Sequence, residues 1–541
     1  MMSDDDFSYN FPFDIPRDNQ KEICKHIDKA FNSGKKFVLI QAPTGAGKSV
    51  MAYTMANYYA HQNKSSYVLT SQKTLQDQYM GDFSKLDKPH VSMKTVKGEA
   101  NYICDMDTNK TCDVGVCKTS KKKMICNCPY KVARDETYAN KIALLNYTYF
   151  LNMSNHTNSI MNDDSGNTGD VIQTKRNLLI LDECHNLENE LTGFNTLEID
   201  FKEFKANNVI MPKLPSQDDA MEWLFGTFAE FIEHQLEVKT IKISGMKEGS
   251  SEFLSENKSL KFVEQIATKL QNIAKCVDKG IEIVVHKDDI YYMYFKPLNI
   301  SHISDDIFSY ADNVIMFSAT ILNAKQMCSD LGIDIKNALY INIPSSFPIK
   351  NRPIYDMSPK IGVLNYNNME AKKPTIVKYI KAILEKHKNE RGIIHTQSYP
   401  LAEYIMKELN NDRLFAPKGK NRDIEIKNFL NDPTFTNGVL VSPSLTEGLD
   451  LSEDLGRFAI VVKAPFPSLG DPYISSRSQL EPVWYDTNTI RTIIQACGRT
   501  VRSPTDKSTT YFLDQAIMNV LKRNLKSIPN YFYDSIKTLE K

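Results

Sequence analysis

A glycine-rich stretch, APTGAGKS, occupies residues 42–49. Such a loop turns backbone N–H groups toward phosphate oxygens, while Lys48 can reach the outer phosphates and the Ser49 hydroxyl can hold Mg²⁺. Because an apolar run at 36–41 precedes it and a helical pattern follows it, we favour a nucleotide site over a chance glycine turn, although the strict pattern has Gly in place of Ala42. The positions expected around the phosphates are Thr44, Gly45, Gly47, Lys48 and Ser49.

Two adjacent acids follow a second apolar run, in LILDECH at 179–185. Asp182 could hold the hydration shell of Mg²⁺, and Glu183 could orient or deprotonate an attacking water. Taken alone, the pair could equally cap the start of a helix. The presence of a phosphate-binding loop in the same chain favours the catalytic interpretation.

Two arginines lie three positions apart near the carboxyl end, in QACGRTVRS at 495–503. On a helix, Arg499 and Arg502 would share one face. Arginines placed across a cleft can stabilise charge on a γ-phosphoryl group during transfer. Without other motifs, a solvated helix face would be the better interpretation.

Five of the ten cysteines fall between positions 104 and 128. Clustered thiols in a chain with no expected export indicate metal binding or catalysis and argue against disulfides. Four thiolates suit either a [4Fe–4S] cluster or tetrahedral zinc. The surrounding Asn, Lys and Asp residues disfavour ordinary core thiols. Between the cysteines, KTSKKKM (118–124) could contact phosphates or be a solvated loop.

Apolar runs alternate with helical patterns in two series, which predicts an α/β fold with parallel sheets. The motifs follow these runs, and ligands of such sheets bind at the carboxyl ends of the strands. Two interruptions, at about 95–147 and 187–305, are expected to be insertions, the second mostly helical. The predicted strands are 36–41, 65–71, 177–183 and 313–320 in the first series, and 391–398, 437–444, 458–466 and 508–514 in the second.

A chain of 541 residues exceeds what one hydrophobic core supports, so several domains are expected. It has no apolar run long enough to span a membrane, and its first residues are acidic, so we expect neither a span nor a signal peptide, and an intracellular protein. The formal net charge is zero, so any DNA-binding surface must be a basic groove balanced by acidic patches elsewhere.

In this order, the motifs APTGAGKS, DECH, SAT (318–320) and QACGRTVR resemble those of the superfamily 2 helicases, and the chain resembles the XPD/DinG group with an iron–sulfur insertion. The resemblance implies two RecA-like motor domains with ATP and Mg²⁺ between them. It makes Arg499 and Arg502 arginine fingers and places Gln495 near the γ-phosphate. The remaining implied roles are adenine contact for Gln20 in RDNQKEI, coupling of hydrolysis to movement for Ser318 and Thr320, and joining of nucleotide and nucleic acid for Gly448 and Asp450 in TEGLDL.

The resemblance also sets the expected domains. The first motor domain would comprise residues 1–94, 148–186 and 306–338, and the second residues 339–541. Residues 95–147 would be the iron–sulfur insertion, and 187–305 an arch-like helical insertion whose sequence matches the family poorly. The implied cluster is [4Fe–4S], with zinc as the alternative. The family commonly has its fourth cysteine before Pro-Tyr, which selects Cys128 over Cys126; the expected ligands are Cys104, Cys112, Cys117 and Cys128.

The implied function is an ATP-dependent DNA helicase that moves 5′ to 3′ on single-stranded DNA, unwinds duplex at junctions, works as a monomer and takes part in DNA repair. Two alternatives stay open. The chain could be a translocase or remodeller that does not unwind, because the motor motifs are the same. It could also be a metal-stabilised nucleic-acid-binding module with a degenerate motor, although the intact Lys48 and Glu183 argue against that.

Overall fold

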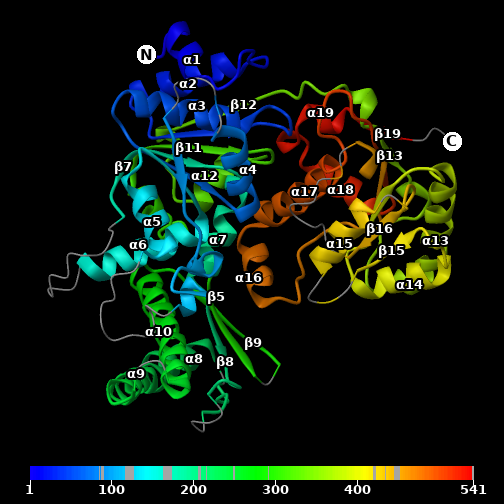
Figure 1. Ribbon diagram of the computed structural model, residues 1–541. Helices are drawn as coiled ribbons and strands as arrows, with labels where there is room; N and C mark the ends of the chain where they lie inside the picture. The colour runs from blue at the N-terminus through cyan, green and yellow to red at the C-terminus, as the bar shows by residue number, and fades with distance from the viewer. Residues whose placement is uncertain are drawn as a thin grey trace.

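The computed structural model contains two parallel β-sheets, each belonging to one lobe (Figure 1). It describes residues 1–84, 86, 91–115, 127–161, 173–204, 209–214, 216–247, 250–289, 291–417, 419, 422–432, 434–443, 451 and 453–538. The expected α/β architecture with two RecA-like domains is confirmed. Among the described residues, no helix combines the length and apolar character needed to cross a bilayer.

The first sheet has the strand order β12-β1-β11-β7-β2-β6-β3, and all its pairings are parallel. Its inner strands are buried on both faces, whereas the two edge strands are only partly buried. Along β1, Leu39 contributes to one core, and Val38 and Ile40 contribute to the other. This alternation explains the continuous apolar runs of the sequence. The strands are β1 (Phe37–Gln41), β2 (Ser66–Thr70), β3 (Met93–Thr95), β6 (Ile142–Asn146), β7 (Arg176–Leu181), β11 (Ala311–Ser318) and β12 (Ala338–Asn342).

Helices cover this sheet on both faces and carry its motifs. They are α1 (Asp4–Asn10), α2 (Gln20–Asn32), α3 (Lys48–His61), α4 (Lys73–Phe83), α6 (Tyr147–Met161), α7 (Leu187–Asn195), α11 (Asp305–Phe308) and α12 (Ala324–Asp330). The short strands β3, β6 and β12 were not among the strands expected from the sequence. Both β6 and β12 join the first sheet, so its strands extend into the ranges 95–147 and 339–541.

The second sheet is also parallel, with the order β15-β16-β14-β17-β18-β13-β19. Its strands are β13 (Ile354–Asp356), β14 (Gly392–His395), β15 (Leu414–Phe415), β16 (Val439–Ser442), β17 (Phe458–Val461), β18 (Thr509–Phe512) and β19 (Ile536–Thr538). Its helices are α13 (Met369–Lys386), α14 (Tyr399–Leu409), α15 (Arg422–Asn431), α16 (Pro472–Leu480), α17 (Pro482–Gly498), α18 (Gln515–Arg523) and α19 (Asn530–Tyr533). In Figure 1, α16 and α17 lie between the two lobes.

Two insertions project from the first lobe (Figure 1). The cysteine-bearing segment contains the hairpin β4 (Ile103–Cys104) and β5 (Asp107–Thr111), followed by α5 (Pro129–Ala139). The arch contains three helices, α8 (Gln217–Trp223), α9 (Ala229–Ser244) and α10 (Ser251–Asp278). It also holds an antiparallel sheet that the sequence did not suggest, formed by β8 (Leu197–Asp200), β9 (Ile283–Asp288) and β10 (Tyr292–Pro297).

A buried arginine ties together the strand ends opposite the motifs. The Arg176 guanidinium donates hydrogen bonds to the carbonyl oxygens of Ser66, Tyr138, Asn140 and Lys141 at 2.8–3.2 Å. It also stacks on the Tyr67 ring, 4.3 Å from the centroid. These bonds join β7, β2 and the start of β6, where backbone carbonyls would otherwise be buried without donors.

We expect Arg176→Lys to lower the free energy of unfolding of the first motor domain by about 3 kcal/mol, because one ammonium cannot replace the fork of donors. Lys175→Ala is the matched control: the adjacent Lys175 makes an exposed ion pair with Asp312, so its loss should cost less than about 1 kcal/mol. Urea denaturation of both variants checks this. Equal losses would contradict the role given to Arg176.

Candidate nucleotide site and cysteine cluster

A cleft of about 820 Å³ lies between the two lobes and collects most of the expected nucleotide residues. The first lobe contributes the loop after β1 and the acids after β7, and the second contributes the end of α17. Gly448 and Asp450, expected to join nucleotide and nucleic acid, lie outside the described residues. The expected residues that line the cleft are Gln20, Thr44, Gly45, Gly47, Lys48, Ser49, Asp182, Glu183, Thr320, Gln495, Arg499 and Arg502.

The phosphate-binding loop depends on two left-handed glycines. Gly45 has φ +82° and Gly47 has φ +79°, a region that side chains disfavour. A Cβ on Gly47 would also overlap the side-chain amide of Gln20. That amide donates to the carbonyl of Ala46 at 3.1 Å, so the expected adenine-side glutamine supports the loop directly.

Lys48 begins α3 and faces the acids of the next motif. Its Nζ lies 3.4 Å from Oε1 of Glu183. Burial by itself lowers the pKa of Lys48, but the negative charges of Glu183 and Asp182 outweigh it and raise the pKa overall. Lys48 is therefore held as a cation where a γ-phosphate would arrive.

The two acids have different environments although they are adjacent. Asp182 is buried, accepts a hydrogen bond from the Tyr79 hydroxyl at 2.9 Å, and has its pKa raised to about 6 by burial and by the charge of Glu183. Burial also opposes ionisation of Glu183, but Lys48 and His185 hold its pKa well below its ordinary value. Glu183 is thus the carboxylate that stays charged and can accept a proton.

The backbone of Glu183 has φ +50°, a left-handed conformation that a glutamate rarely adopts. Residues kept in such conformations cluster at functional sites, where the surrounding structure fixes them. Here the backbone N–H of Glu183 donates to the Asp182 carboxylate at 3.0 Å, and the chain continues through a short turn directly into α7.

His185 connects the two lobes. Its Nδ1 lies 2.9 Å from the Ser318 hydroxyl and 3.3 Å from Oε2 of Glu183. Its Nε2 lies 2.8 Å from Nε2 of Gln495, which also donates to the Thr320 hydroxyl at 3.3 Å. If the Gln495 amide nitrogen donates to Nε2, the proton of a neutral His185 ring is on Nδ1. A movement of α17 would therefore be transmitted to Glu183 through the imidazole ring of His185.

His185 and Tyr79 were not among the site residues expected from the sequence. His185 could have been found, since it follows the two acids directly in the chain. Tyr79 lies on α4, far from the acids in sequence, and only folding brings its hydroxyl to Asp182.

Three of the expected metal ligands lie together in the cysteine-bearing segment. Cys104, Cys112 and Cys128 are buried, and Sγ of Cys112 lies 3.7 Å from Sγ of Cys128. Burial raises the pKa of the Cys112 thiol to about 11, and the neighbouring Cys128 and Cys104 add to the rise. A Cβ on Gly115 would lie 3.0 Å from Sγ of Cys104.

Cys117, Cys126 and the lysines between them lie outside the described residues. Within the described part of the chain, no three His, Cys, Asp or Glu side chains form a metal site by themselves. The three thiols agree in kind with a thiolate-bound metal, because cysteine thiolates are ligands of both zinc and iron–sulfur clusters. They do not distinguish iron from zinc.

Comparison with known proteins supports the two-lobe helicase architecture. Residues 14–211 match the family described as "Type III restriction enzyme, res subunit", and residues 380–535 match "Helicase C-terminal domain". A protein of Methanocaldococcus jannaschii named as a probable ATP-dependent helicase is 20% identical, over 98% of this chain and 96% of its own length. The UvrABC system protein B of Lactobacillus johnsonii is 34% identical over 13% of this chain and 10% of its own length.

Solved structures show the same fold. One titled XPD helicase has a TM-score of 0.64 at 16% identity and covers 97% of this chain and 99% of that one. The structure of S. tokodaii Xpd4 has a TM-score of 0.56 at 17% identity, with 97% and 100% covered. With the helicase motifs gathered in one cleft between two RecA-like sheets, the chain has the fold of the XPD structures and resembles a superfamily 2 helicase.

Proposed function

We propose that this ATP-dependent helicase acts on DNA, moving 5′ to 3′ on a single strand and unwinding duplex at junctions. The observation that carries the motor part is the shared cleft: Lys48 and Glu183 come from one sheet, and Gln495, Arg499 and Arg502 come from the other. ATP bound to the first lobe would draw in the second, and hydrolysis would release it. The DNA substrate and the direction rest on the resemblance of the sequence to XPD/DinG helicases.

In the proposed mechanism Asp182 holds the Mg²⁺ shell, and Glu183 orients the attacking water and takes its proton. The arginines stabilise the charge that develops on the γ-phosphoryl group. Gln20 holds the loop from the adenine side. For Gly448 and Asp450 we propose contact between the nucleotide site and the nucleic acid.

Strand displacement tests the substrate and the direction. With ATP and Mg²⁺, we expect release of the labelled strand from a duplex with a 5′ single-stranded DNA tail, and none from the same duplex with a 3′ tail. An RNA-tailed duplex serves as the comparison for substrate class. DNA-stimulated ATP hydrolysis without displacement on any of these would instead support the non-unwinding translocase.

We expect Lys48→Ala to abolish DNA-stimulated ATP hydrolysis, because it removes the cation that faces the β/γ-phosphates. Glu183→Gln should bind ATP but hydrolyse it about 10²–10⁴-fold more slowly, since it keeps the side-chain shape and loses the proton acceptor. Steady-state kinetics and nucleotide-binding titrations measure the two effects. Lys64→Ala, at an exposed site after α3, is the control. Near-normal turnover in Glu183→Gln would remove the assigned base.

For the cysteine-bearing segment we propose a [4Fe–4S] cluster held by Cys104, Cys112, Cys117 and Cys128. Such a group would brace the segment beside the path of the DNA. The buried contact of Cys112 with Cys128 supports placing both in one ligand set. Zinc in the same thiolates is the alternative.

Anaerobically purified protein should show a broad visible absorption and contain iron. Replacing any one of the four proposed ligands with Ser should bleach the absorption and reduce unwinding more than ATP hydrolysis, because the ATP site is built elsewhere. Cys126→Ser should keep the colour, as should Cys276→Ser, a buried thiol of the arch. A colourless wild-type protein that contains zinc would contradict the cluster. Bleaching by Cys126→Ser but not by Cys128→Ser would contradict the choice of fourth ligand.

A further inference from the structure

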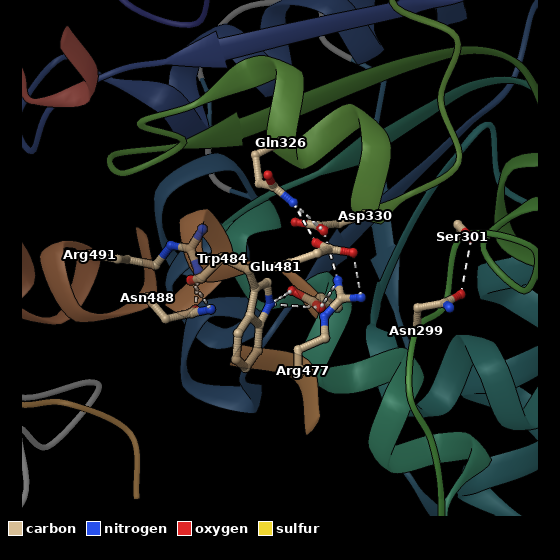
Figure 2. A network of polar contacts seen from close by, with 10 residues as sticks. Asn299, Ser301, Gln326, Asp330, Arg477, Glu481, Trp484, Asn488 and Arg491 are labelled. Atoms are coloured by element: carbon tan, nitrogen blue, oxygen red, sulfur yellow. Dashed lines mark hydrogen bonds and ion pairs between the residues drawn. The ribbon is translucent and has the colours of Figure 1, made fainter. Parts of the chain in front are cut away.

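A second contact between the lobes lies away from the nucleotide cleft, around the buried Arg477 (Figure 2). Its guanidinium reaches the carboxylates of Asp330 at 2.8 Å, Glu481 at 3.0 Å and Glu188 at 3.3 Å. Glu188 and Asp330 belong to α7 and α12 of the first lobe, whereas Arg477 and Glu481 belong to the second. We call these residues, with Trp484 and Gln326, the interlobe clamp.

Trp484 fixes the geometry of the clamp. Its indole Nε1 lies 3.0 Å from both carboxylate oxygens of Glu188, and its ring lies under the guanidinium of Arg477 at 5.5 Å. The Gln326 side-chain amide donates to Asp330 of its own helix at 2.9 Å and, across the lobes, to Glu481 at 2.7 Å (Figure 2). Each of the three carboxylates therefore accepts a hydrogen bond from Trp484 or Gln326 in addition to its ion pair with Arg477.

The clamp has more negative than positive charge. One guanidinium faces three carboxylates, and burial together with the charge of Glu188 raises the pKa of Asp330 to about 7. The cluster depends above all on Arg477, since removing it would leave three carboxylates without a cation. Burying these charges costs desolvation free energy, although an interface between motor lobes must open repeatedly. What the clamp can do therefore depends on where it lies relative to the proposed hydrolysis site.

Glu188 and Trp484 each lie on a helix whose other neighbours belong to the proposed hydrolysis site. Glu188 is in the first turn of α7, immediately after the turn that holds Glu183 and His185. Trp484 is in the first turn of α17, and Gln495 is near its end. The two lie about 16 Å apart along this helix at a rise of 1.5 Å per residue.

A third contact lies between these ends. The Arg491 side chain donates to the carbonyl of Thr320 at 3.2 Å. Trp484, Arg491 and Gln495 fall close to one face of α17, because their spacings approximate whole turns of 3.6 residues. One face of one helix thus meets the first lobe at the clamp, at Thr320 and at His185.

We propose that Arg477 and Trp484 are positioning residues for ATP hydrolysis, which hold α17 on the first lobe and thereby place Gln495 and the arginines beyond it against the nucleotide. This inference rests on the roles proposed above for Gln495 and Arg499. ATP binding depends on the loop of the first lobe, so the clamp acts on turnover and not on affinity for ATP. In an enzyme that stabilises developing charge with pre-placed groups, a small displacement of those groups lowers the rate.

The clamp also touches the arch. Val284 and Leu298 of the arch region pack with Tyr473 and Trp484 in one buried cluster, and Nζ of Lys296 lies 3.7 Å from the centre of the Tyr473 ring. A displacement of α16 and α17 would therefore also disturb the base of the arch.

The test uses Trp484→Phe and Glu188→Gln, since Arg477→Ala would leave three buried carboxylates without a cation and could prevent folding. Glu188→Gln keeps the side-chain size and loses the charge, whereas Trp484→Phe keeps an aromatic ring, is smaller, and loses the indole N–H that bonds Glu188 across the lobes. We expect kcat for ATP with single-stranded DNA to fall about tenfold in each variant, with KM for ATP changed less than about twofold. The double variant should lose about as much as the more severe single variant and less than the product of the two losses, because both changes act on the same contact.

Tyr485→Phe is the matched control. It lies on the same helix and also loses one hydrogen bond, from its hydroxyl to the Pro467 carbonyl at 3.0 Å, but both groups belong to the second lobe. Its kcat should stay within about twofold of the wild type. An equal loss in this variant, or unchanged kcat in both clamp variants, would overturn the proposal.

A second measurement needs no hydrolysis. The chain has two tryptophans, so Trp223→Phe leaves Trp484 as the sole reporter of the clamp. Addition of a non-hydrolysable ATP analogue with single-stranded DNA should change its emission, and Glu188→Gln should alter the emission of the free protein and reduce that change. An emission insensitive to both overturns the proposal. If Lys48→Ala hydrolyses ATP as well as the wild type, the proposed function fails instead, and the emission measurement still decides whether the clamp responds to nucleotide.

Discussion

The contact of His185 with Gln495 joins the turn after β7 on one sheet to a helix on the other, and the cleft between the lobes has its full lining only while the two sheets are docked. Each lobe is stable through its own double-faced core. The groups that would act on the γ-phosphate, in contrast, are divided between them. Separation of the lobes would therefore divide the lining of the cleft without disturbing either core.

Within the first lobe, the site depends on one buried balance of charge. Lys48, Asp182 and Glu183 lie close enough that each alters the pKa of the others. The lysine keeps Glu183 ionised, while burial and the charge of Glu183 push Asp182 toward protonation. Mg²⁺ beside Asp182 would restore its ionisation, so metal binding and the charge state of this acid are linked.

Both insertions are anchored in the first lobe, and the arch also packs against the second. The arch rises from α7, directly after the catalytic loop, and its sheet packs against α16 of the second lobe. The cysteine-bearing segment leaves the first sheet after β3 and returns through α5 to β6. The arch is therefore rooted next to the turn that holds Glu183 and His185, whereas the cysteine-bearing segment is rooted at the edge of the first sheet formed by β6 and β3.

Much of the fold could be predicted, because buried parallel strands require continuous apolar runs and helices between them. All eight strands expected from the sequence are present, while the strands β3, β6 and β12 of the first sheet and β13, β15 and β19 of the second were not expected. The antiparallel sheet of the arch was also missed, because β10 fully buries only every second residue and β9 is exposed at its carboxyl end, so neither strand is a continuous buried run.

The sequence by itself determined the local chemistry: a phosphate-binding loop, two acids after a strand, an arginine pair and a group of thiols, each readable because neighbouring residues supply the parts. Only the tertiary structure decided which of these meet. Tyr79 reaches Asp182, His185 reaches Gln495, and Arg477 gathers Glu188 and Asp330 through contacts between segments far apart in the chain. No local pattern encodes such pairs, since their distance is set by how two sheets and their helices pack, and each partner alone resembles an ordinary surface polar residue.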